Sequence, residues 1–296
     1  MATPEHDASN IRSRGIFIID EASIQEKFDT FWGPDWADLA ATDVAAYANN
    51  LQGHVFQNKK QHQAKEPART VQNDGPNFRK WPERSPVLPN PKDKEFPGSN
   101  NEFKLVANTS SFDVAQYPDS PQRAGMSFIH VLGVPMARIF NGVALNKSNV
   151  RILQDIIDTF TAQWQTSRFR EEVIQHQKVV IENTHRRQLE CLGPEEETKK
   201  KRVEENYQKA LGHFEELEPK AYKLEAGDFS FGLHLYPDHS VNHLHLHIIA
   251  GPPEFRAYST RMHEEKTMDV RAVQQFIMSD GFPDYQSSKR SVQTVA

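Results

Sequence analysis

Cysteine is almost absent from the chain: Cys191 is the only one among 296 residues. A single cysteine excludes an intramolecular disulfide and any zinc site built from several thiolates. Long apolar runs are missing as well, because no segment approaches the roughly 18 apolar residues that a membrane-spanning helix needs. We therefore expect no membrane as a partner.

The sequence is also poor in apolar residues and in positive charge. Hydrophobic residues make up 37% and the mean hydropathy is -0.70, which indicates that part of the chain stays solvated. A formal net charge of -5 provides no overall basic field, so we do not expect nucleic acid as a partner. Residues 1–10 lack the basic and apolar regions of a secretory signal, and the expected location is the cytoplasm or the nucleus.

Composition divides the chain into an N-terminal extension, a main domain and a tail. Within residues 1–102, apolar periodicity predicts one helix inside 34–51, and a Lys-, Gln-, Asn- and Pro-rich stretch then predicts a linker or an extended arm. Residues 103–282 mix strand and helix patterns, which indicates an α+β domain. Residues 283–296 form a polar tail.

Short apolar runs bounded by turn residues predict the strands of the main domain. They lie at 103–106, 112–114, 126–134, 228–236 and 241–250. The last two are joined by a turn at 237–240 and should form an antiparallel hairpin. An amphipathic helix over 148–164, with Asn146 or Ser148 as its N-cap, separates the two groups of strands, and another over 269–278 follows them.

Residues 165–225 carry charged helical sequence that we assign to an insertion in the domain. Gly193-Pro194 breaks it, which predicts one helix to about 192 and a second to about 218. The simplest interpretation is a projecting helical hairpin with a solvated charged face. A lid, a dimer contact and a partner-binding surface all fit this hairpin, and the sequence does not choose between them.

Histidine is concentrated in one short segment. Five of the 13 histidines lie between His234 and His247. Because side chains alternate across a strand, His243, His245 and His247 would share one face, while the apolar residues between them would face the core.

Chemistry alone leaves three interpretations of this histidine face. It can be a solvated strand surface, or a metal site completed loosely by Asp238, His239 and Glu254. It can also be a nucleophilic site, in which a neutral imidazole attacks phosphorus while neighbouring groups fix its tautomer. Burying several imidazoles for structure alone is costly, which favours the last two interpretations over the first.

Residues 240–249 read Ser-Val-Asn-His-Leu-His-Leu-His-Ile-Ile, and this pattern resembles the signature of the histidine triad (HIT) family. Together with residues 231–237, the hairpin is most similar to the aprataxin-type and Hint-type branches. Upstream, residues 130–135 read His-Val-Leu-Gly-Val-Pro and resemble the His-x-Leu-x-[Ile/Val]-Pro strand of the same family. Residues 117–122 resemble the loop before that strand.

The resemblance covers about residues 103–164 and 227–280. It implies a HIT-like half-barrel antiparallel sheet with packed helices. Compact relatives of this family are homodimers, and the sequence does not decide whether this chain is one. The implied activity is a nucleotide hydrolase that cleaves a phosphoramidate or a phosphoanhydride at the α-phosphorus, with no cofactor and no metal. Its site would consist of the catalytic His245, His243, His247 and His130 and the substrate-binding Ser240, His239 and Asp119.

The resemblance also implies a role for each catalytic histidine. His245 would form a covalent nucleotidyl intermediate that water hydrolyses. His243 would sit behind it, hydrogen-bonded so that the attacking nitrogen keeps its lone pair, and His130 would complete this network with His243. His247 would contact the phosphate oxygens and stabilise the charge that develops at phosphorus.

The substrate-binding residues depart in part from the family. Ser240 would bind phosphate or help to protonate the leaving group, and Asp119 would bind the ribose from a position shifted by one residue. His239 stands where a phosphate-contacting glutamine is common, and Met136 stands where a lysine is common. An aprataxin-like zinc finger cannot form from one cysteine, and the retained third histidine favours hydrolysis over transfer. The alternatives are a nucleotide-binding adaptor with little turnover and a metal-dependent enzyme.

Overall fold

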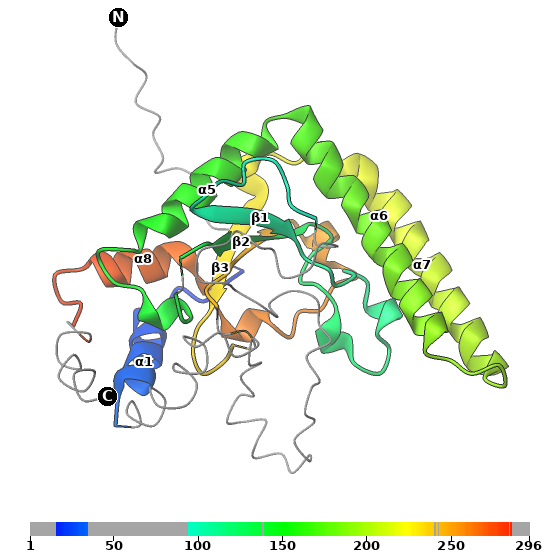
Figure 1. Ribbon diagram of the computed structural model, residues 1–296, viewed down its shortest axis with the longest axis horizontal. Coiled ribbons are helices and arrows are strands. Elements are labelled where there is room, and N and C mark those ends of the chain that lie inside the picture. Colours follow the sequence, from blue (N-terminus) through cyan, green and yellow to red (C-terminus); the bar gives the residue numbers. More distant parts are fainter. Residues whose placement is uncertain are drawn as a thin grey trace, which may run out of the picture.

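The computed structural model describes residues 16–34, 94–137, 139–239, 241, 243–283 and 285. Over these residues the chain has an α+β fold, in which one five-stranded antiparallel sheet is combined with helices (Figure 1). The strands are β1 Phe103–Ala107, β2 His130–Pro135, β3 Phe229–His234, β4 Leu246–Ala250 and β5 Thr267–Asp269, in the spatial order β1-β2-β4-β3-β5. The α-helices are α1 Glu21–Trp32, α5 Arg151–Trp164, α6 Ser167–Glu190, α7 Glu197–Ala221 and α8 Val270–Met278.

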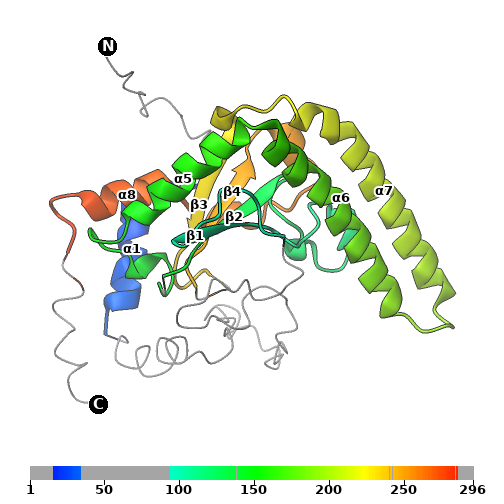
Figure 2. The same cartoon turned by 45° about the horizontal axis from the view of Figure 1, so that its top comes forward.

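Helix α5 packs across the sheet through the apolar face that its sequence predicts, as Figure 2 shows. Leu153, Ile156 and Phe160 are fully buried on this face. Beneath it, Gly133 of β2 has no side chain, and a Cβ atom there would come within 2.3 Å of the Ile156 Cγ2 atom. Glycine at this position therefore permits the close approach of helix and strand.

The predicted N-cap of α5 is wrong. The helix begins at Arg151, and its N-cap residue, Val150, makes no side-chain capping bond. Asn146 Oδ1 instead accepts hydrogen bonds from both the backbone N–H and the hydroxyl of Ser148. The two candidate caps thus bond to each other in a turn that ends before the helix.

The strand predicted at residues 112–114 is also wrong. Val114–Gln116 is a short 3-10 helix, and the Asp113 side chain accepts a hydrogen bond from the Ala115 N–H, 2.7 Å away. An aspartate that bonds its own backbone two residues on favours a turn over a strand ladder.

The charged insertion forms the predicted hairpin of α6 and α7, which extends away from the sheet (Figures 1 and 2). The break falls at Gly193-Pro194, as predicted, whereas α7 continues past Pro219 to Ala221. The base of the hairpin is tied to the domain by Trp164, whose Nε1 donates to the Leu224 carbonyl at 2.9 Å.

Residues of the predicted N-terminal extension pack into the hydrophobic core of the main domain. Ile24, Phe28 and Phe31 of α1 are buried in the same hydrophobic core as the sheet, and α1 lies against α8. Ile18 forms a parallel bridge with Met268 of β5. The helix predicted inside 34–51 lies, beyond residue 34, outside the described residues.

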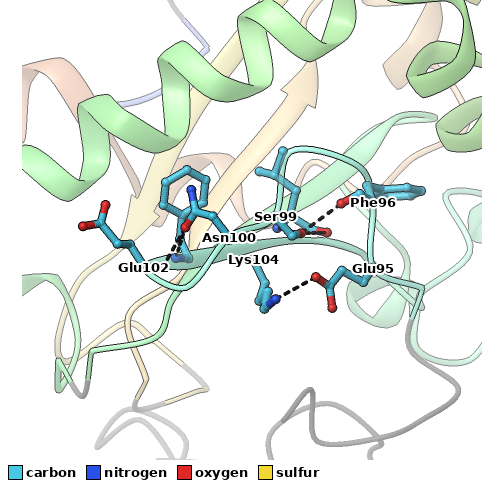
Figure 3. Close-up of polar contacts among 8 residues, drawn as sticks. Glu95, Phe96, Ser99, Asn100, Glu102 and Lys104 are labelled. Atoms are coloured by element: carbon cyan, nitrogen blue, oxygen red, sulfur yellow. Dashed lines mark hydrogen bonds and ion pairs between the residues drawn. The ribbon is translucent and has the colours of Figure 1, made fainter. Parts of the chain in front are cut away.

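The segment before β1 folds back along that strand (Figure 3). Phe96 N–H donates to the Leu105 carbonyl at 2.8 Å, and Lys104 pairs with Glu95 at 2.8 Å. Asn100 Oδ1 accepts from the backbone N–H groups of Glu102 and Phe103, at 2.7 and 3.0 Å, and so closes the turn that starts β1.

No helix within the described part of the chain is both long enough and apolar enough to cross a membrane.

Candidate active site

Three neighbouring strands bring histidines onto one face of the sheet. His130 of β2 is paired with Ile249, two residues from His247 on β4, and His247 is paired with Gly232, two residues from His234 on β3. Residues that are paired, or two apart on one strand, share a face. The rings accordingly meet: His130 Nε2 lies 2.9 Å from His247 Nδ1, and the His234 and His247 ring centroids are 4.4 Å apart.

His243 and His245 precede the regular strand, which begins only at Leu246. His243 forms an isolated bridge with Phe140, and its Nε2 donates to the Pro135 carbonyl at 2.7 Å. His130 therefore bonds to His247 and not to His243, in contrast to the network that the resemblance implies. Of the strand predicted over 241–250, only the second half is a regular strand. His243, in the first half, instead contacts Phe140 and the Pro135 carbonyl at the end of β2.

The tautomer of His245 follows from one short contact. Its Nδ1 lies 2.8 Å from the backbone carbonyl oxygen of His243. A carbonyl oxygen only accepts, so Nδ1 carries the proton and Nε2 of the neutral ring keeps a lone pair. The backbone carbonyl of His243 therefore fixes this tautomer, and the bond from the His243 side chain to the Pro135 carbonyl holds the residue in place.

Burial favours the neutral form of the His130, His245 and His247 rings, because it lowers the pKa of each. The exposed fractions of His130, His243, His245 and His247 lie between 2% and 8%. Burial lowers the pKa of His245, and it lowers the pKa of His247 well below its ordinary value, with neighbouring histidines adding to the shift. Burial, together with the charges of His263 and His245, lowers the pKa of His130 to about 3. A neutral ring is the form that can act as a nucleophile or as a single hydrogen-bond donor.

His247 has one nitrogen that is bonded and one that is not. Its Nδ1 meets His130, whereas its Nε2 is buried and has no hydrogen-bond partner among the described residues. The His247 ring lies beside that of His245, with centroids 4.8 Å apart. An uncompensated polar atom in the interior costs free energy unless a ligand or a water satisfies it, so this nitrogen makes the cluster a candidate binding site.

The predicted substrate-binding residues do not lie together in the way that the histidines do. Asp119 has an 89% exposed side chain that lies 3.7 Å from Arg202 of α7, and the structure does not draw it into the buried histidine cluster. His239 is buried, and its ring contacts the rings of Tyr236 and Phe140. Ser240 lies outside the described residues.

Two histidines of the cluster were not assigned to the site from the sequence. His234 Nε2 lies 2.9 Å from Thr267 Oγ1, and its ring centroid is 5.5 Å from that of His263. His263 Nε2 donates to the Gln122 carbonyl at 3.0 Å. His234 could have been assigned from the sequence, because it ends the strand that was predicted to pair with the histidine strand. His263 lies in a loop, and only the tertiary structure shows that it is close to His234.

Positive charge near the turn before the histidines comes from two lysines. Lys27 of α1 contacts Asp238 at 2.5 Å, with both side chains largely buried. Burial lowers the pKa of Lys266, against the attraction of Asp238, which raises it.

Within the residues that the structure describes, no group of three or more His, Cys, Asp or Glu side chains is arranged to hold a metal ion. Comparisons with protein-family models, with curated proteins and with solved structures find no match to this chain.

Proposed function

We propose that the chain is a nucleotide hydrolase of the histidine triad type, which cleaves a phosphoramidate or a phosphoanhydride at the α-phosphorus. The observation that carries the proposal is the state of His245. Its Nδ1 is committed to the His243 carbonyl, so the buried neutral ring presents a lone pair on Nε2. Beside it lies a second imidazole, His247, with a buried nitrogen that has no partner among the described residues.

The proposed reaction is a double displacement. The Nε2 lone pair of His245 forms a bond to the α-phosphorus, and the bond from phosphorus to the leaving nitrogen or oxygen breaks. The leaving group departs with that electron pair and takes up a proton. A water oxygen then bonds to phosphorus, the phosphorus–nitrogen bond breaks, its electron pair returns to Nε2, and one proton of the water is released.

The fold supports the same proposal. A five-stranded antiparallel sheet with α5 packed across it is the coarse architecture that the resemblance implies. The two motifs that carry the resemblance, at 130–135 and 240–249, come from segments more than a hundred residues apart, and β2 and β4 are neighbours in the sheet. This adjacency places His130 in the histidine cluster, which neither motif alone would require.

The test is release of AMP from adenosine phosphoramidate and from diadenosine triphosphate. We expect the parent protein to release AMP and the His245→Ala variant to release none. His176→Ala is the matched control, because His176 is a half-buried histidine with a pKa that burial lowers to about 4, but lies in the hairpin. Release of AMP by His245→Ala at the parent rate would contradict the proposal. A parent that binds AMP but releases none from either substrate would support an adaptor instead.

A further inference from the structure

Asn108 follows β1 and meets the far side of His130. Its Nδ2 lies 2.6 Å from His130 Nδ1, while its Oδ1 accepts from the Ser110 N–H at 3.1 Å. The bond to Ser110 identifies the oxygen of the amide, so the nitrogen faces the histidine. Met126 N–H also points to His130 Nδ1, at 3.4 Å.

Two donors therefore converge on one nitrogen of His130. Amide nitrogens only donate, so His130 Nδ1 must accept, and the single proton of the neutral ring lies on Nε2. His130 Nε2–H then donates to His247 Nδ1, 2.9 Å away.

The same argument passes to His247. Because its Nδ1 accepts from His130, the proton of the neutral His247 ring lies on Nε2. That atom is the buried one without a partner among the described residues. The result is a free N–H donor beside the His245 ring, whose own Nε2 holds a lone pair.

We propose that Asn108 is a positioning residue which, through His130, holds His247 in the tautomer with its proton on Nε2, ready to donate to an oxygen of the substrate's α-phosphoryl group. The inference rests on the proposed function for its substrate, but the tautomers themselves do not depend on it. The chain of hydrogen bonds from Asn108 through His130 to His247 is formed before the substrate binds. It therefore provides a preorganised neutral donor, which stabilises negative charge that develops on the phosphoryl oxygens.

A purely structural role for Asn108 predicts something different. In that case the side chain would serve only to close the turn after β1, as Asn100 closes the turn before it (Figure 3). Asn→Asp at either position keeps an acceptor oxygen for the turn. At residue 108 alone, the substitution also replaces the donor that faces His130 with an acceptor.

The first experiment reads the ring protons in the substrate-free protein. Nitrogen-15 spectra of the histidine rings, with His130 and His247 assigned by loss of signal in His130→Gln and His247→Gln, report which nitrogen of each ring is protonated. We expect Nε2 to be protonated and Nδ1 bare in both rings. In Asn108→Asp, His130 Nδ1 should become protonated, and in Asn100→Asp nothing should change. A parent spectrum with His247 protonated on Nδ1, or an unchanged His130 in Asn108→Asp, would overturn the inference.

The second experiment measures AMP release. For Asn108→Asp we expect kcat to fall by about 10- to 100-fold, the usual range for loss of one hydrogen bond to a charged group, with a smaller change in KM. Asn108→Ala should fall less, because Met126 N–H still donates to His130. Asn100→Asp should match the parent. An Asn108→Asp protein that folds and keeps the parent kcat would overturn the positioning role.

The two experiments separate this inference from the proposed function. If the parent releases no AMP, the proposed function fails, while the ring spectra still decide whether Asn108 sets the tautomers. If the parent is active and the spectra contradict the expected tautomers, only the role of Asn108 fails. Should Asn108→Asp not fold, the parent spectrum still decides the tautomers of His130 and His247, and an Asn108→Ala protein that keeps the parent kcat would overturn the positioning role.

Discussion

The sheet and the helical hairpin both contain histidines, and they use them in different ways. In the hairpin, His185 is paired with Glu204 and stacks on Tyr207, with ring centroids 4.0 Å apart. His213 is likewise paired with a carboxylate, Asp113, and stacks on a tyrosine ring. In the sheet, by contrast, the histidines contact one another, backbone carbonyls, the Asn108 amide and the Thr267 hydroxyl.

The difference lies in what surrounds each ring, and it bears on which histidine could serve as the proposed nucleophile. A carboxylate neighbour holds an imidazole in place through an ion pair when the ring is charged. Buried neighbours without such a partner keep the ring neutral, and single donors or acceptors then decide which nitrogen keeps its lone pair. His185 and His213 therefore connect the hairpin helices to neighbouring side chains, whereas the sheet histidines have the neutral rings that the proposed function requires.

The largest effect should come from removing the nucleophile. His245→Ala should lower AMP release by a factor on the order of 10³ or more, as loss of a nucleophile does elsewhere. His213→Ala, which removes a hairpin histidine, should leave kcat within about threefold of the parent, since effects on a contact outside the site are small. Steady-state kinetics of the two purified variants test this contrast. Equal losses in both would remove the distinction between the two regions.

Next in size is the loss of the donor at His247. His247→Ala should lower kcat by about 10²- to 10³-fold, the usual effect of losing one donor to a developing oxyanion. His247→Gln should lose less, because its side-chain amide still offers a neutral N–H. The comparison is made with single-turnover rates on adenosine phosphoramidate. A kcat for His247→Ala that equals the parent value would show that the unpartnered nitrogen does not act in the reaction.

Stability should respond to pH through the sheet histidines. The pKa of His130 is lowered from 6.5 to about 3 in the folded protein, because the ring is buried. Between these values the unfolded chain binds a proton that the folded protein does not, so the free energy of unfolding should fall as pH falls from 6.5 towards 3. Urea unfolding at several pH values measures this slope. The slope should be shallower in His130→Gln, and a slope in that variant as steep as in the parent would assign the effect to other groups.

The smallest effects, of opposite sign, should come from one substitution made in both regions. Gly133→Ala places a Cβ atom 2.3 Å from Ile156 and should destabilise the protein by about 1 to 3 kcal/mol. Gly212 lies inside α7, and a Cβ there would meet nothing within 4 Å. Gly212→Ala should therefore stabilise by about 0.5 to 1 kcal/mol, because alanine favours a helix. Thermal unfolding of both variants checks the signs, and two changes of the same sign would contradict the packing described.

The sequence allowed most of the sheet and hairpin to be predicted, because their signals are local. Periodicity correctly predicted β1, the pairing of β3 with β4, the buried face of α5 and the break between α6 and α7. Helix α1 was not predicted, although Asp20 caps it at Ser23 and the apolar residues Ile24, Phe28 and Phe31 follow at helical spacing.

The contacts of the site were harder to predict, because distant segments supply them. The bond of His243 to Pro135 and the bridge of His243 to Phe140 depend on a strand end and a loop about a hundred residues upstream. The pairing of His130 with His247 depends on the register between β2 and β4, which no single motif encodes. The placing of His245 beside His247 was predictable from their spacing of two residues, but their hydrogen-bond partners were not.

The most direct test of the central claim is the covalent intermediate itself. The protein is mixed with adenosine phosphoramidate or diadenosine triphosphate labelled at the α-phosphorus, quenched within a turnover, digested, and mapped by mass spectrometry. The account predicts an adenylyl group on His245 in the parent and none in His245→Ala. Release of AMP by the parent with no adduct at any time, or an adduct on another residue, would contradict it.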